Sequence, residues 1–393
     1  MSQTKVQLVE GKSDQTITGS TLTTTTLNAA NLNSGAFSNR NLIINGGMEV
    51  AQRGTQTSLS TGGNYGGCDR WKLEISNLGT WTLGQDSTDA PKDKGFANCL
   101  KLDCTTADAS PAAGDLLILQ HPIEGYLCNQ LAYGQSTAKS VTLSFWCKAE
   151  INGWSSGTKS FVAELQAGST TYESGNLVTL TTNDTWQKVT CTFPGMTGQA
   201  IASSTNDLGM MINLWLDAGT NYTSGTLSTS WSNKSSADRC PGTTLGLGAH
   251  TDNNFFMTGV QLEIGDVATD FEHRSYADEL IRCKRYCEVI LEGTGSGAYM
   301  SNTVAYTTNQ LYSIFRFSVE KRATPTLVQT TGTNYYTNWN NNSGTTFNGL
   351  TGLSWPNTRA TAVYQSGSAF TAGHAGLLGS DNTSAKVYLQ CEL

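Results

Sequence analysis

The stretch NLIINGGMEVAQRG, residues 41–54, divides the chain into two parts of different character. Before it, residues 1–40 are rich in Thr, Ser and Asn, and after it apolar residues recur in short runs. Glycine supplies the backbone conformations that a tight turn needs. We therefore predict that Asn45-Gly46-Gly47 leads the chain from a polar segment into the first strand of a globular domain.

The composition predicts an all-β fold. The chain has 393 residues, of which 38% are hydrophobic, so it is long and apolar enough for two or three domains with real cores. Only 14% of the residues are charged, whereas Gly occurs 41 times and Pro 7 times. Thr, Ser, Asn, Trp and Tyr fill much of the remainder. Short strands joined by tight turns have this composition.

The charge argues against a nucleic-acid partner, and the lengths of the apolar runs argue against a membrane span. The net charge is −7 and the pI is near 5.2, whereas nucleic-acid binding needs clustered Lys and Arg. The basic groups at residues 282–285 and 321–322 are short. No apolar run approaches the roughly 20 residues of a membrane span, and residues 1–15 lack the apolar core of a secretory signal. We expect no nucleic-acid partner, no membrane insertion, and synthesis in a cytoplasm.

Ten cysteines lie scattered through strand-like segments such as SFWCKA and KVTCTF. A domain of this size does not need disulfides, and the close pairs Cys99/Cys104 and Cys283/Cys287 do not have zinc-site spacing. We interpret the cysteines as small, buried, reduced hydrophobes, with disulfides as the alternative.

A five-residue repeat runs through the leading segment. Written in fives from Thr16, the chain places one apolar residue at each second position, namely Ile17, Leu22, Leu27, Leu32, Phe37 and Leu42. A period of five fits neither an α-helix nor a flat strand, and it resembles the pentapeptide-repeat family, in which such residues lie inside a β-solenoid. Burial of six side chains cannot offset the ordering of about 30 residues. We predict that residues 1–40 form an attachment arm or a three-chain stalk, with a disordered leader as the alternative.

Residues 41–275 are predicted to form a jelly-roll β-sandwich. Apolar alternation recurs in runs of four to ten residues, separated by Gly, Asn, Ser and Asp clusters. Many short antiparallel strands with long loops are typical of two packed sheets. The predicted strands cover residues 71–75, 99–104, 116–119, 141–147, 161–165, 186–193, 210–216 and 255–264.

Four segments of this domain carry a family resemblance: NLIINGGME at 41–49, DRW at 69–71, WQKVTCTFPG at 186–195 and FFMTGVQLEIGDVATDFEHRSYADELIRCKRYCE at 255–288. They resemble a domain of tail-fibre and other virion proteins of bacteriophages. That domain is similar to carbohydrate-binding jelly rolls that start with N-G-x-x-E. The resemblance implies a virion protein that is made in the host cytoplasm and binds glycans. It also implies a possible structural calcium held by Glu49 and Glu263, with two ordinary strand-end carboxylates as the alternative.

Residues 276–290 are predicted to form an amphipathic linker helix, and residues 291–393 a second, smaller β-domain. Tyr276, Leu280, Cys283, Cys287 and Ile290 fall at steps of four and three, opposite the charged residues. This stripe either packs on the preceding sandwich or joins three copies of the chain. Strand-like runs then return at 299–306, 310–319, 326–330, 361–364 and 386–391.

Aromatic residues in polar loops are the candidate glycan contacts. Aromatic rings stack on sugar faces and amides bond to hydroxyls, so the segment TNYYTNWNNNSG at 333–344 is the first candidate. The alternative is a loop folded back on its own core. The candidate residues are Tyr335, Tyr336, Trp339 and Asn340, together with Trp154 and Trp231 in the first domain.

No catalytic motif is present. The nucleophile-elbow, metalloprotease, phosphate-loop and calcium-loop patterns are absent, so we expect no enzyme. We predict a homotrimeric tail fibre that attaches to other virion proteins through residues 1–40 and recognises glycans on the host cell. One alternative is a head or tail decoration protein without receptor binding. The second is a glycan depolymerase using distant carboxylates such as Asp217, Asp252, Glu263 or Asp270.

Overall fold

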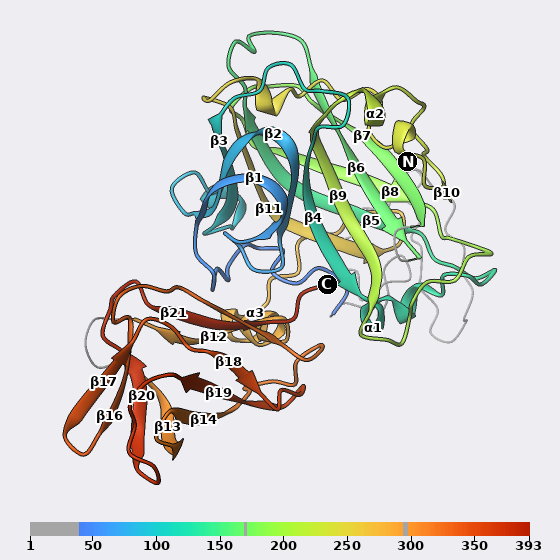
Figure 1. Ribbon diagram of the computed structural model, residues 1–393. Helices are drawn as coiled ribbons and strands as arrows, with labels where there is room; N and C mark the ends of the chain where they lie inside the picture. The colour runs from blue at the N-terminus through green and yellow to red at the C-terminus, as the bar shows by residue number, and fades with distance from the viewer. Residues whose placement is uncertain (1–38, 169–170, 294–297) are drawn as a thin grey trace, which may run out of the picture.

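The computed structural model describes residues 39–168, 171–293 and 298–393, which form a larger and a smaller β-unit (Figure 1). Most of the predicted arm, including Ile17, Leu22, Leu27, Leu32 and Phe37, lies outside the described residues. Leu42 is described, and it is buried in the core of the larger unit. Its assignment to the seam of the arm was therefore wrong, because its side chain packs inside the sandwich.

The larger unit contains one continuous antiparallel sheet of eleven strands. All eight predicted runs in this unit overlap observed strands, so the all-β fold class is confirmed. Two short helices, α1 (Gly125–Cys128) and α2 (Thr220–Thr223), lie in its loops. The strands are β1 (Gln56–Tyr65), β2 (Lys72–Asp86), β3 (Cys99–Thr106), β4 (Leu116–Glu124), β5 (Val141–Glu150), β6 (Lys159–Ala167), β7 (Tyr172–Leu180), β8 (Gln187–Phe193), β9 (Leu208–Ala218), β10 (Ser232–Asn233) and β11 (Asn254–Ile264).

Strand β2 joins the two layers of this unit. The strand order is β10-β7-β6-β9-β4-β2-β3-β11-β5-β8, and β1 also pairs with β2. Residues 72–77 of β2 pair with β4, whereas residues 80–86 pair with β3. Between these halves Gly79 has φ of 70°, and a Cβ there would lie 2.3 Å from the Thr106 carbonyl oxygen. The change of layer therefore requires glycine at this position.

The core lies between the two layers. Phe161 of β6 packs edge-on against Phe255 of β11, with ring centres 5.6 Å apart, and Phe145 of β5 lies beside them. Alternation along each strand sends one set of side chains into this core and the other set outward. All ten cysteines are buried with free thiols, as predicted. Burial raises the pKa of the Cys191 thiol to about 12, so it is a packing residue and not a nucleophile.

Helix α3 (Tyr276–Lys284) follows the larger unit, and the Ser275 hydroxyl caps it by accepting from the backbone N–H of Asp278. The prediction of a helix to residue 290 was wrong, because the chain enters strand β12 at Cys287. Within β12, Cys287 pairs with Gln390 and Val289 with Tyr388. The adjacent β-branched residues Val289 and Ile290 favour a strand.

The smaller unit packs two sheets face to face. Buried Val363, Leu378, Tyr336 and Val387 form its core. The sheets have the orders β12-β21-β15 and β17-β16-β20-β13-β14-β19-β18. The strands are β12 (Cys287–Glu292), β13 (Ala298–Thr307), β14 (Gln310–Arg316), β15 (Thr326–Gln329), β16 (Tyr336–Asn340), β17 (Ser343–Phe347), β18 (Gly352–Ser354), β19 (Ala360–Ser366), β20 (Ala375–Ser380) and β21 (Lys386–Gln390).

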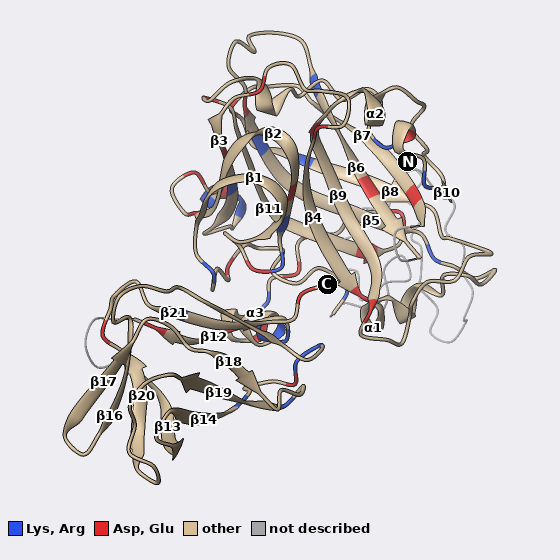
Figure 2. Cartoon of the chain, viewed as in Figure 1, with Lys and Arg blue, Asp and Glu red and all other residues tan. Residues whose placement is uncertain are grey.

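A buried polar network joins the two units. Arg53 donates to Glu392 at 2.8 Å, and Arg70 pairs with the same carboxylate while its guanidinium lies 3.6 Å from the centre of the Tyr286 ring. Arg285, at the C-terminal end of α3, pairs with Glu124 at the end of β4. Charged residues lie close around α3, where the units meet (Figure 2). Among the described residues, no helix has both the length and the hydropathy of a membrane span.

Candidate functional site

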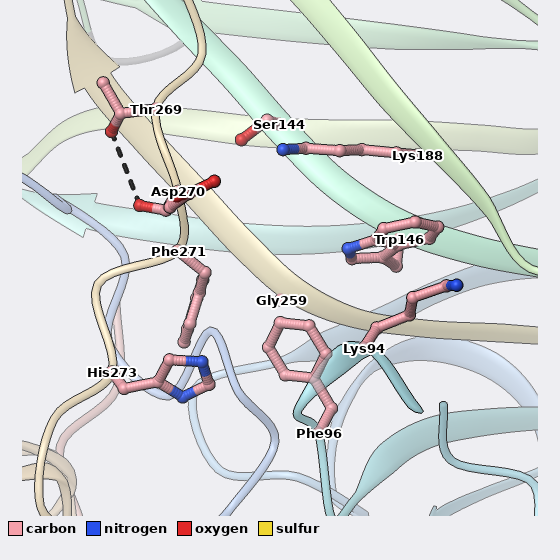
Figure 3. Close-up of a pocket in the computed structure, with 10 residues that line it drawn as sticks. All are labelled: Lys94, Phe96, Ser144, Trp146, Lys188, Gly259, Thr269, Asp270, Phe271 and His273. Atoms are coloured by element: carbon pink, nitrogen blue, oxygen red, sulfur yellow. Dashed lines mark hydrogen bonds between the residues drawn. The ribbon is translucent and has the colours of Figure 1, made fainter. Parts of the chain in front are cut away.

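A hollow of about 310 Å³ lies on the outer face of the layer that contains β8, β5 and β11 (Figure 3). The loop between β2 and β3 and the segment after β11 form its walls. Its floor is the sheet itself. The lining residues are Lys94, Phe96, Ser144, Trp146, Lys188, Gly259, Thr269, Asp270, Phe271 and His273.

A bulge in β11 makes room for one wall of the hollow. The register of β11 with β5 shifts between Thr258 and Gln261, and Gly259 in that gap has φ of 63°. The Phe96 ring lies directly over Gly259, where a Cβ would be 2.5 Å from the ring. Phe96 also packs edge-on against Phe271 at 5.2 Å between ring centres. Glycine at 259 therefore sets the position of the aromatic wall.

Trp146 supplies an aromatic surface between two cations. Its ring is half-buried on β5, and Lys188 of β8 is its cross-strand partner. The Lys94 ammonium lies 5.6 Å from the centre of the Trp146 ring. Figure 3 shows Ser144 and Lys188 beside Trp146, with Phe96, Phe271 and His273 on the other side of the hollow. The arrangement combines ring faces with separate donors and acceptors.

The hollow combines ring faces with groups that can form hydrogen bonds. Aromatic faces take up the apolar faces of sugar rings, and lysine, serine and imidazole groups bond to hydroxyls. Glycoside hydrolysis needs two carboxyl groups facing the same bond. Asp270 is the one carboxylate among the residues that line the hollow. Sequence reasoning placed Trp146 on a strand but did not select it. Lys94 lies in a loop without a recognisable motif, and Phe271 lies within the quoted segment 255–288 but was not singled out as a contact.

The aromatic residues selected from sequence do not form one site. Tyr336 is fully buried and its hydroxyl donates to the Thr330 carbonyl oxygen at 2.7 Å. Trp154 is also buried, with its indole N–H donating to Gly157. Both assignments as ligand contacts were wrong, because these rings are core residues. Trp231 is half-buried and packs edge-on against Tyr133.

The segment predicted as a binding loop is a β-hairpin. Residues 336–340 pair with residues 343–347, so alternate side chains point to opposite faces. Tyr336 points inward, whereas Trp339 is 39% exposed on the outer face. Tyr335 packs half-buried against the core, and Asn340 is half-exposed. Of the four predicted contacts, Trp339 keeps an open ring.

The two predicted calcium ligands have separate protein partners. Glu49 accepts from the Asn98 amide at 3.0 Å, and buried Glu263 accepts from the backbone N–H of Thr269 at 2.8 Å. Arg40 lies 3.8 Å from Glu263. Within the described ranges, no group of three or more His, Cys, Asp or Glu residues lies together. Calcium needs six to eight oxygens, and this geometry does not supply them from side chains.

A polar row crosses the outer face of the other layer. Gln120, Asn213 and Glu164 are cross-strand neighbours on β4, β9 and β6. Gln120 donates to Asn213 at 2.8 Å and Asn213 donates to Glu164 at 2.7 Å, while Arg239 covers the row with two bonds to Glu164. All three row residues are buried. The only sequence signal for this row was one polar residue at an outward position of each of three apolar strands.

Glu173 on β7 lies next to this row. Its carboxylate is 3.7 Å from Arg239 and accepts from the backbone N–H of Ser235. Burial raises the pKa of Glu173 to about 7, and the neighbouring Glu164 carboxylate contributes in the same direction. This face of the sandwich therefore holds a carboxyl group that titrates near neutral pH.

Comparisons with known proteins identify no family. No family model matches the sequence, and no curated protein matches it. Among solved structures, the chain is similar to the C-terminal family 22 carbohydrate-binding module of Clostridium thermocellum Xyn10B, with 12% identity, a TM-score of 0.28, and coverage of 51% of this chain and 89% of that chain. It is also similar to the xylan-binding domain CBM22-1 of Paenibacillus barcinonensis Xyn10C, with 9% identity, a TM-score of 0.27, and coverage of 61% and 100%.

A third similar structure is the glycoside hydrolase domain of Endo-D from Streptococcus pneumoniae. Here the identity is 12% and the TM-score 0.22, with 86% of this chain and 42% of that chain covered. TM-scores this low establish neither a shared family nor a shared ligand. The assignment of function therefore has to stand on the residues of this chain.

Proposed function

We propose that this protein is a carbohydrate-binding protein without catalytic activity, and that its ligand occupies the hollow beside Trp146. One observation carries the proposal: a tryptophan face lies between Lys94 and Lys188 in a hollow that also presents Ser144 and His273. Sugar recognition needs an apolar ring face and separate polar groups for hydroxyls, and this hollow provides both.

The charges favour an acidic or neutral glycan over a basic ligand. Lys188 and Lys94 are both exposed at the hollow, where Lys94 also pairs with Asp93 at 2.8 Å, and Asp270 is the one carboxylate among the lining residues. Positive charge attracts carboxylated or sulfated sugars, and the ionic contribution weakens as salt screens it. An acidic polysaccharide should therefore bind more tightly at low than at high salt.

A binding experiment tests this site directly. We expect Trp146→Ala to weaken binding of an acidic oligosaccharide at least about tenfold, as measured by calorimetry against a panel of bacterial surface glycans. Trp231→Ala serves as the matched control, because this half-buried tryptophan of the same unit lies outside the hollow. Equal loss in both variants, or unchanged binding by Trp146→Ala, would refute the assignment.

For the biological setting, we propose a homotrimeric bacteriophage tail fibre that is attached to the virion through residues 1–40. The resemblance of residues 41–49, 69–71, 186–195 and 255–288 to phage virion proteins supports this assignment. Two consecutive β-units behind a polar leading segment also suit a fibre that carries a binding surface away from the particle. Many copies of one weak site would raise avidity without further contacts.

Two alternatives remain, and each predicts a different result. A head or tail decoration protein would occur on purified particles, yet antibodies against it would not block host adsorption. A glycan depolymerase would release new reducing ends from host polysaccharide. The absence of a second carboxylate from the lining of the hollow favours binding over hydrolysis at that site.

A further inference from the structure

The outer face of the seven-stranded sheet in the smaller unit exposes apolar side chains across five adjacent strands or their loops. Three of its residues are more than two thirds exposed: Trp355 is 76% exposed, Ile314 72% and Tyr306 71%. Val304, Leu377 and Trp339 extend the same face, because Asn302 pairs with Leu377 and Leu377 with Trp339. Scattered single apolar residues are normal on a surface, but a contiguous group marks a contact.

Apolar side chains lie on both faces of this sheet. On the inner face Val363 and Leu378 pack against Val387 of the three-stranded sheet. The neighbouring residues on these strands point to the outer face, where Tyr364 pairs with Tyr312 and Tyr312 pairs with Val304. Strands with apolar residues at both alternating positions are typical of sheets covered on both sides. The sequence of these strands thus suits a partner on the outer face.

The rings of this face pack against one another. Tyr312 stacks on Trp355 at 5.6 Å and on Tyr364 at 5.8 Å, and it meets Tyr306 edge-on at 5.9 Å. Trp355 holds this position with φ of 50°, in the left-handed region that a bulky side chain rarely adopts. The stack occupies the ring faces of Tyr312 that a sugar would need. Ile314, Val304 and Leu377 have no group that could bond to a hydroxyl.

The charge of the face suits a second copy of this chain. Each chain has a net charge of −7, so two copies repel wherever their carboxylates meet. The seven strands of this sheet contain one charged side chain, Arg316, and no carboxylate. Figure 2 accordingly shows their ribbons almost entirely without charge colours. We propose that copies of this chain associate through this outer face. The inference rests on the proposed homotrimer, for which it names the contact surface, and it is independent of the proposed glycan site.

Thiol labelling can test the face itself. All ten native cysteines are buried, so a single new surface cysteine is the reactive one. Ile314→Cys and Tyr306→Cys place a thiol on the face, and Val267→Cys places one on the larger unit at an apolar residue that is 55% exposed. In a lone chain the two face positions are more open than the control. Each full-length variant is treated with N-ethylmaleimide, and light scattering gives the number of chains per particle.

If copies associate through the face, the thiols at 314 and 306 become less reactive than the control thiol at 267. We expect the thiols at 314 and 306 to react at least about tenfold more slowly than the thiol at 267, in particles of more than one chain. Equal rates would overturn the proposal, whether the particles hold one chain or several, since self-association would then use another surface. Protection that appears only after addition of an oligosaccharide or of anionic lipid vesicles would also overturn it.

Discussion

Arg53 and Glu392 form a buried ion pair that joins the two units of the protein across a sequence separation of 339 residues. The side chains are 1% and 5% exposed, and Glu392 also pairs with Arg70. Burial is the largest single influence on the pKa of Arg53 and would lower it, but the surrounding negative groups, led by Glu392 and including Asp69, together outweigh burial and raise the pKa. One carboxylate is thus the ion-pair partner of two buried guanidinium groups.

Replacing this carboxylate should loosen the junction strongly. Glu392→Gln leaves two buried cations without their counter-charge, which we expect to cost about 3 kcal/mol of unfolding free energy. Urea unfolding measures the loss. The control is Lys386→Gln, which breaks the pair of Lys386 with the exposed Glu292 and should cost less than about 1 kcal/mol. Equal losses of unfolding free energy in the two variants would show that burial does not make the Glu392 ion pairs stronger than an exposed pair.

The raised pKa of Glu173 predicts a pH-dependent stability. Its folded-state pKa of about 7 exceeds the ordinary value, so the folded protein holds this proton more tightly than the unfolded chain. This contribution is complete below the unfolded pKa of about 4.3 and is lost as the pH rises through 7. Glu173→Gln stays neutral, so its Tm should exceed that of the parent protein near pH 8 and match it near pH 4.

His121 gives the stability a pH dependence of the opposite sign, so its effect has to be separated from that of Glu173. Burial holds the pKa of His121 well below its ordinary value, and Arg70 adds to the effect. Its contribution to stability is therefore lost as the pH falls below about 6.5. Because this term is the same in both proteins, the difference in Tm between Glu173→Gln and the parent isolates Glu173. A difference that stays constant from acid to alkaline pH would contradict the prediction.

Gly259 should be needed for the shape of the hollow as well as for stability. Gly259→Ala combines an unfavourable φ with a Cβ at 2.5 Å from the Phe96 ring, and we expect a cost of about 2–4 kcal/mol. Gly153→Ala is the matched control, because Gly153 has φ of 74° with no atom within 4 Å of its Cβ. Calorimetric unfolding should show the larger loss at 259, and oligosaccharide binding should weaken there alone. Equal losses would mean that Phe96 moves aside freely.

The sequence predicted the features that depend on local alternation. Strands such as β5 and β9 were recognised because every second residue points inward and is apolar. Trp146 on β5 and the polar Asn213 on β9 fall at the outward positions between them. The helix was placed correctly at Tyr276, but its end was not, because Cys283, Cys287 and Ile290 fit a helical period until pairing with β21 decides for a strand.

The candidate site was harder to predict because its parts meet only in the folded chain. Lys94, Trp146 and Phe271 come from three separate segments, and no spacing connects them. Tyr336 and Trp339 were grouped as one contact because they are close in sequence. Their separation by three residues on a strand places them on opposite faces, and this follows once the hairpin is known.

Removal of the leading segment should separate folding from attachment. Arg40 donates to the Asp270 carbonyl oxygen at 2.6 Å, and the buried Asn41 side chain accepts from Leu262 and donates to Val260. A variant that begins at residue 39 keeps these bonds and should retain its Tm, whereas one that begins at residue 42 should lose about 3 kcal/mol. Neither should enter virions if residues 1–40 attach the protein. Incorporation of the variant that begins at residue 39 would show that attachment uses the β-units, and an unfolded product would show that the leading segment supports the fold.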